Sequence, residues 1–68
     1  MNLQQCRYVD MVARMGSFSQ AAKELFMTQP NLSSSIKDLE NELGVQLFVR
    51  SNVSTRPTED GYDFLKYA

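Results

Sequence analysis

The side chains best suited to chemistry lie in one stretch, TQPNLSSSIK, which covers residues 28–37. It offers hydroxyl and amide groups, and Lys37 is its only charged residue. Gln29 can donate and accept hydrogen bonds at once. Thr28 is suited to begin a helix, where it and the free N–H groups could hold a phosphate. The stretch therefore indicates a surface that recognises a partner mainly by hydrogen bonds.

The other reactive residue types favour neither catalysis nor metal binding. The 68 residues include no His and a single Cys, so the chain has no zinc ligand set and no intrachain disulfide. Cys6 falls on an apolar helical stripe, which favours a core position. We see no carboxylate pair that would converge on a pocket, and expect no enzyme activity and no cofactor.

Length and composition indicate one small globular domain without a membrane partner. No apolar run approaches the ~20 residues that a membrane span needs, and the N-terminus lacks the order of a signal peptide. These features, with the lone Cys, predict a reduced, cytoplasmic setting.

The positions of the charged residues are more informative than the net charge. The net charge of −1 and the pI of about 5.1 argue mildly against nucleic-acid binding. However, Lys37 is the only charge in residues 26–37, and Arg50 and Arg56 are the only charges in residues 45–56. Both segments are free of acids.

Helical periodicity predicts the elements that would position these residues. The first helix covers about residues 3–15 and ends at Gly16. A second begins at Ser17 and ends near residues 25–26. The first helix carries two apolar stripes, and we expect the second stripe to pack on the last helix. The stripes are Leu3, Cys6, Val9, Val12 and Ala13, and then Tyr8, Met11 and Met15.

The third helix covers residues 28–43, with Pro30 in its first turn and Gly44 as its stop. The spacing of four apolar residues predicts a core stripe. These are Leu32, Ile36, Leu39 and Leu43. Pro30, Ser34, Lys37 and Asn41 then fall on the opposite face, with Ser33 on its flank.

Two short strands are predicted at residues 48–50 and 55–57, around a turn at 51–54. A last helix begins at Thr58, with Tyr62 and Leu65 on its apolar stripe. Gly61 would weaken this helix by roughly 1 kcal/mol relative to Ala. We expect the acids of the third and last helices to lie on solvated faces.

These elements predict a mainly α fold, a winged helix-turn-helix with a three-helix core, a two-stranded wing and the start of a linker helix. In that motif the second helix of the pair lies in the DNA major groove and its N-terminal residues contact base edges. Gln29 could then contact adenine, and the Pro30 ring a thymine methyl. Arg50 and Arg56 could reach phosphates from the wing.

The chain resembles, along its whole length, the N-terminal DNA-binding domain of LysR-type transcriptional regulators of bacteria. The resemblance is carried by GSFSQAAKEL (16–25), TQPNLSSSIKDLENELGVQLFVR (28–50) and PTEDG (57–61). It implies a DNA-binding domain over residues 1–57, with recognition helix 28–43 in the major groove and wing 50–56 at the adjacent minor groove or backbone. It also implies the start of a dimerising linker helix over residues 58–68, where we assign Tyr62 and Leu65 to dimerisation.

The resemblance implies double-stranded DNA as the partner. Family contacts carry over onto Thr28, Gln29, Pro30, Ser33 and Arg50. To these we add Asn31, Ser34, Lys37, Asn52, Val53 and Arg56 as candidate contacts. The chain departs from the family at Ser34 and Val53, where many members have a basic residue, and at Asn31, where alanine is common. Asn31, Ser35 or Asn52 could compensate.

The resemblance further implies a homodimer or a tetramer for the full-length regulator, and we expect a weak dimer or a monomer for this fragment. A small-molecule effector would act only through a C-terminal domain that we expect to be missing here. The alternative is a winged helix that contacts proteins and has lost DNA binding. The acidic pI, the missing basic residues and the stripe Tyr8, Met11 and Met15 favour that alternative.

Overall fold

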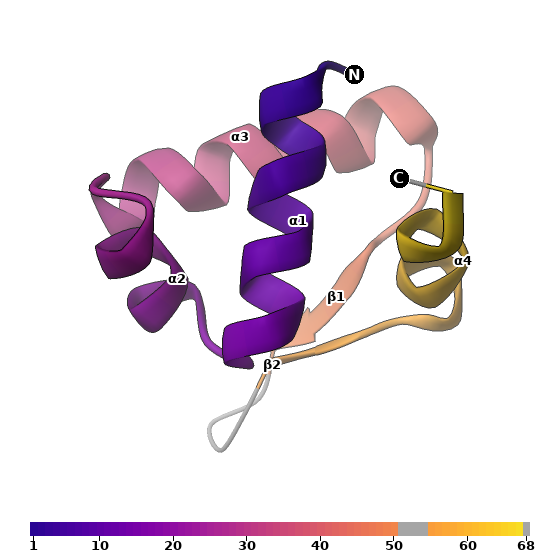
Figure 1. Cartoon of the computed structure of the whole chain (residues 1–68). Helices are drawn as coiled ribbons and strands as arrows, with labels where there is room; N and C mark the ends of the chain where they lie inside the picture. The colour runs from indigo at the N-terminus through magenta and orange to yellow at the C-terminus, as the bar shows by residue number, and fades with distance from the viewer. Residues whose placement is uncertain (51–54, 68) are drawn as a thin grey trace.

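A computed structural model describes residues 1–50 and 55–67 of the chain. These residues form four helices and one antiparallel hairpin. The elements are α1 (Leu3–Met15), α2 (Phe18–Glu24), α3 (Gln29–Leu43), β1 (Phe48–Arg50), β2 (Thr55–Pro57) and α4 (Glu59–Tyr67). In Figure 1, α1 crosses α3, while α2 and α4 lie on opposite sides of α1 and the hairpin lies below. The predicted mainly α winged helix-turn-helix is confirmed.

The helix ends follow the predicted capping residues. Ser17 Oγ accepts a hydrogen bond from Gln20 N (3.2 Å), and Thr28 Oγ1 accepts one from Asn31 N (3.4 Å). Gly16 and Gly44 end α1 and α3 with φ values of 64° and 74°. This left-handed conformation costs glycine little, because glycine has no Cβ.

A continuous core joins the three N-terminal helices to the hairpin. It comprises Val9, Val12, Phe18, Ala21, Ala22, Leu32, Ile36, Leu39, Leu47 and Phe48. The predicted α3 stripe is therefore buried at Leu32, Ile36 and Leu39. Leu3 and Leu43 were wrongly assigned to the core, because they remain 78% and 39% exposed. Each lies in a terminal turn of its helix, at the edge of the core.

The packing of α4 differs from the prediction. Phe64 and Leu65 pack against the core, whereas Tyr62 is 60% exposed, so Tyr62 and Leu65 do not form one inward stripe. Leu65 lies across a small cavity from Cys6, Asp10 and Arg14 of α1. The stripe of Tyr8, Met11 and Met15 was therefore wrongly expected to face α4, because helical geometry puts it on another side of α1.

The main chain around Leu47 joins α3, β1 and α4. The Glu40 carboxylate accepts hydrogen bonds from Leu47 N (2.6 Å) and Phe48 N (3.4 Å). Thr58 N donates to Leu47 O (2.9 Å). A Cβ at Gly61 would collide with Leu47 O, so this glycine allows α4 to approach β1. The predictions of a solvated Glu40 and of Gly61 as a mere weak point are corrected.

Among the described residues, no helix combines the length and the apolar character that crossing a bilayer requires.

Candidate nucleic-acid interface

The first half of α3 presents an exposed polar surface. Thr28, Gln29, Pro30 and Asn31 are exposed. One turn later, Ser34 and Lys37 are exposed as well, and Ser33 is half-buried. This arrangement follows from the amphipathic period, because burying Leu32, Ile36 and Leu39 turns the opposite face of the helix outward. Seven predicted contact residues therefore share one end of one helix.

The beginning of α3 suits hydrogen bonding to a large partner. Thr28 caps the helix, and the Pro30 ring occupies its first turn, where no intrahelical N–H partner is lost. The Gln29 side chain carries an acceptor oxygen and an NH₂ donor on an exposed position. The helix N-terminus also carries a partial positive charge. The N-terminal end of α3 can therefore hydrogen-bond to polar groups of a partner and attract an anion at the same time.

A shallow groove connects α3 with the hairpin. A cavity of about 450 Å³ is lined by Lys37 and Glu40 of α3, by Gln46, and by Phe48, Val49 and Arg50 of β1. Lys37 and Arg50 place two cations on its walls. The Glu40 carboxylate is bonded to the main chain of Leu47 and Phe48. The walls of the groove thus carry two cations and one carboxylate that is already bonded to the main chain.

The hairpin places its two arginines on opposite faces. Arg50 pairs with Thr55, and Val49 pairs with Arg56. Because neighbouring residues of a strand point to opposite faces, Arg50 shares the face of buried Phe48 and Arg56 lies on the other face. Both arginines are exposed. The predicted contacts Asn52 and Val53 lie in residues 51–54, outside the described residues.

The Arg50 guanidinium stacks on an aromatic ring that the sequence did not single out. Its Cζ lies 3.9 Å from the centroid of the Phe18 ring. Phe18 opens α2 and packs edge-on against Phe48, with ring centroids 5.7 Å apart and an interplanar angle of 77°. Alternation along the strand predicts that residues 48 and 50 lie on the same face of the hairpin. Nothing in the sequence spacing indicated that this face contacts residue 18.

The two predicted dimerisation residues lie in different surroundings. Tyr62 is exposed on α4, whereas Leu65 packs partly against the core. The Tyr62 side chain is therefore available on the surface of α4, whereas Leu65 is only partly available.

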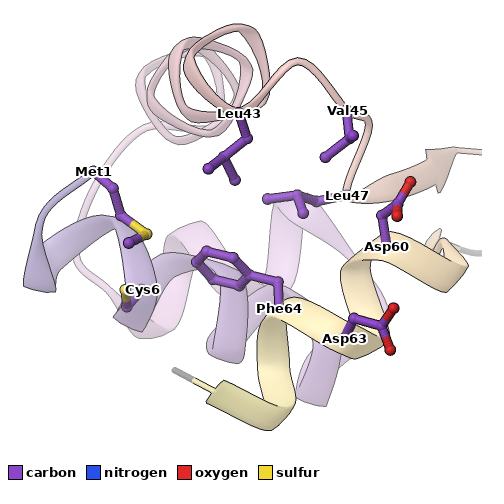
Figure 2. Close-up of a pocket in the computed structure, with 8 residues that line it drawn as sticks. All are labelled: Met1, Cys6, Leu43, Val45, Leu47, Asp60, Asp63 and Phe64. Carbon is purple, nitrogen blue, oxygen red and sulfur yellow. The ribbon is translucent and has the colours of Figure 1, made fainter.

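An apolar cavity of about 390 Å³ lies between α1, α3 and α4. Figure 2 shows Leu43, Leu47 and Phe64 around it, with the carboxylates of Asp60 and Asp63 directed away from its centre. Among residues 1–50 and 55–67, no cluster of three His, Cys, Asp or Glu side chains could hold a metal ion.

The helix pair, the polar face of α3 and the adjoining hairpin define a winged helix-turn-helix domain. The family model described as bacterial regulatory helix-turn-helix protein, lysR family, matches residues 3–62. The chain belongs to this LysR family.

Curated relatives extend well beyond the region shared with this chain. The probable RuBisCO transcriptional regulator of Thalassiosira pseudonana is 47% identical over 66 residues, which cover 97% of this chain and 22% of that protein. The HTH-type transcriptional regulator BenM of Acinetobacter baylyi is 41% identical over 68 residues, which cover 100% of this chain and 22% of that protein. The chain thus spans about a fifth of the length of these relatives.

Solved structures share the fold closely. The crystal structure of the BenM_DBD/catB site 1 DNA complex matches with a TM-score of 0.94 and 40% identity, covering 98% of this chain and 74% of that one. The crystal structure of the CbnR_DBD–DNA complex matches with a TM-score of 0.93 and 36% identity, covering 98% and 77% of the two chains.

Proposed function

We propose that this chain binds double-stranded DNA sequence-specifically, as the DNA-binding domain of a LysR-type transcriptional regulator. The observation that carries the proposal is the exposed, acid-free first half of α3, which adjoins a groove lined by Lys37 and Arg50. The proposal places recognition helix 28–43 in the major groove and wing 50–56 against the adjacent minor groove or backbone. The DNA complexes of the similar BenM and CbnR domains support this assignment.

The exposed groups divide into base readers and phosphate contacts. Gln29 is assigned to a base edge, because a carboxamide can bond both hydrogen-bonding groups of adenine. The Pro30 ring is assigned to a thymine methyl, and Ser33 to a base edge beside it. Thr28 and the helix N-terminus are assigned to a phosphate.

The remaining contacts surround these central ones. Asn31, Ser34 and Lys37 extend the α3 surface, and Lys37 supplies its cation. Arg50 and Arg56 are assigned to phosphates on the wing, and the proposal keeps Asn52 and Val53 as wing-tip contacts. With serine at position 34, the helix carries one cation, so both its affinity for non-specific DNA and the salt dependence of that affinity should be modest.

We further propose separate roles for the two parts of the chain. Residues 1–57 would form the DNA-binding unit, and residues 58–68 would begin a linker helix in which Tyr62 and Leu65 contribute to a homodimer. Residues 1–68 alone would be a monomer or a weak dimer, and a small-molecule effector would bind outside these residues. The regulator would act in the cytoplasm without enzyme activity.

Selection from a duplex pool with a randomised centre tests the proposal. The chain should enrich a defined set of sequences, and its affinity for them should fall with rising salt as phosphate contacts are lost. Fluorescence anisotropy measures the affinity for an enriched duplex and for a random duplex at each salt concentration. No enriched sequence and no salt-dependent binding at low ionic strength would contradict the proposal.

A further inference from the structure

We propose that Phe18 is a positioning residue for DNA binding: its ring holds the Arg50 guanidinium where it can meet a phosphate. The inference deepens the proposed function and rests on it. Phe18 lies in α2, outside the recognition helix and the wing, and it is only 4% exposed. It therefore acts on DNA through Arg50 rather than by direct contact.

The first support is the contact itself. The Arg50 Cζ lies 3.9 Å from the centroid of the Phe18 ring, within the range in which a cation is attracted to an aromatic face. Phe48 packs edge-on against the same ring, at 77° and 5.7 Å between centroids. Since Phe48 is itself buried, the ring has little freedom to move away from the guanidinium.

The second support is the main chain, which fixes both partners. Thr55, the register partner of Arg50, donates a hydrogen bond from its N–H to Gly16 O (3.2 Å). Gly16 lies two residues before Phe18 and ends α1 in a left-handed conformation with φ 64°. This hydrogen bond ties β2, the strand paired with the one that carries Arg50, to the turn that leads to Phe18.

The third support is the charge around Arg50. Among residues 1–50 and 55–67, no carboxylate forms an ion pair with this guanidinium. A stacked arginine keeps its N–H groups at the ring edge available for an anion. Ordering this long side chain before binding reduces the entropy lost when a phosphate is bound.

The neighbouring arginine provides an internal comparison. Arg56 lies on the opposite face of the hairpin, paired with exposed Val49. The two arginines thus belong to one hairpin but only Arg50 stacks on Phe18. In the free chain, ¹⁵N relaxation should show the Arg50 Nε–H group as more ordered than that of Arg56. Equal mobility of the two groups would overturn the proposal, whatever any variant does.

A double-mutant cycle measures the effect on binding. The four proteins are the wild-type chain, Phe18→Leu, Arg50→Ala and the double variant, titrated with a fluorescein-labelled random duplex of about 30 base pairs at low salt. Phe18→Leu should weaken binding about two- to fivefold when Arg50 is present. It should have almost no effect in the Arg50→Ala background. Equal losses in both backgrounds, or no loss in either, would overturn the proposal.

Salt dependence separates positioning from general destabilisation. Arg50→Ala should reduce the slope of log affinity against log salt by about 0.9, the value of one phosphate contact. Phe18→Leu should give a slope between those of the wild type and Arg50→Ala. The control is Val9→Ala, which removes buried volume from α1, where no proposed contact lies. It should lower the melting temperature and leave the slope and the affinity unchanged.

Failure of the proposed function would look different. If the wild-type chain showed no salt-dependent binding of the duplex, DNA binding itself would be refuted, while the relaxation comparison of Arg50 with Arg56 would still report on the stacking.

Discussion

In the N-terminal half of α3, polar side chains face solvent. The Thr28 side chain accepts a hydrogen bond from Asn31 N within its own cap, and Gln29, Pro30 and Ser34 are exposed. In the C-terminal half, Glu40 reaches across to the main chain of the next element and bonds both Leu47 N and Phe48 N. One helix with one apolar stripe therefore has two different ends.

The difference explains how a small domain can carry a binding surface without losing its fold. A polar helix face that contacts only solvent is free to vary with the partner it must recognise. The end that holds β1 and α4 is constrained by hydrogen bonds and close packing, so changes there should act on stability.

Gly61→Ala should have the largest effect. The added Cβ would collide with Leu47 O and lie 3.2 Å from Pro57 Cβ, so α4 would have to move away from β1. We expect a loss of about 3 kcal/mol in unfolding free energy, measured by urea denaturation. The control is Asp63→Ala on the exposed face of the same helix, which should change stability far less. Equal stability of the two variants would show that α4 does not depend on close approach to Leu47.

Glu40→Ala should follow, because it removes the acceptor of two main-chain N–H groups at the edge of the core. We expect a loss of about 2 kcal/mol in unfolding free energy. Glu42→Ala is the matched control: its carboxylate pairs with the Met1 amine, and both groups are about half exposed. That variant should lose less than about 1 kcal/mol. A larger loss for Glu42→Ala would remove the special role of Glu40.

Gln29→Ala tests the other end of α3. We expect about a tenfold loss of affinity for a selected duplex, because one bidentate base contact contributes about 1–3 kcal/mol of discrimination. Asn41→Ala is the control, since Asn41 is also exposed on α3 but lies beyond the proposed contact surface. It should bind as the wild type does. Anisotropy titrations would contradict the account if the two variants lost the same affinity.

Phe26→Asn should have the smallest effect, and it should be a gain. Phe26, in the turn before α3, is 96% exposed and has φ 56°, a left-handed conformation that asparagine tolerates better than phenylalanine. We expect about 1 kcal/mol of added unfolding free energy. Thermal unfolding checks this, and a lower melting temperature would mean that the exposed ring makes a stabilising contact.

Local sequence signals predicted the elements well. Thr28 and Gly44 marked the limits of α3, and periodicity identified Leu32, Ile36 and Leu39 as its core face. These features depend on residues a few positions apart, where propensity and capping act. The polar surface of α3 was predictable for the same reason.

Contacts between distant segments were not predictable in this way. Glu40 looked like one more acid on a solvated helix, and its bond to Leu47 N appears only once β1 is folded against α3. Gly61 looked like a weak point because helix propensity ignores the approach of another main chain. The stacking of Arg50 on Phe18 joins residues that no periodicity relates.

The central claim is that the exposed polar face of the N-terminal half of α3 reads DNA, whereas Glu40 in the C-terminal half holds β1 in place. The most direct test measures urea unfolding and duplex affinity on Gln29→Ala and Glu40→Ala side by side, at a temperature where both are folded. The account predicts about a tenfold loss of affinity with unchanged stability for Gln29→Ala. It predicts about 2 kcal/mol of lost stability without a loss of affinity for Glu40→Ala. Lost affinity in Glu40→Ala together with full affinity in Gln29→Ala would contradict it.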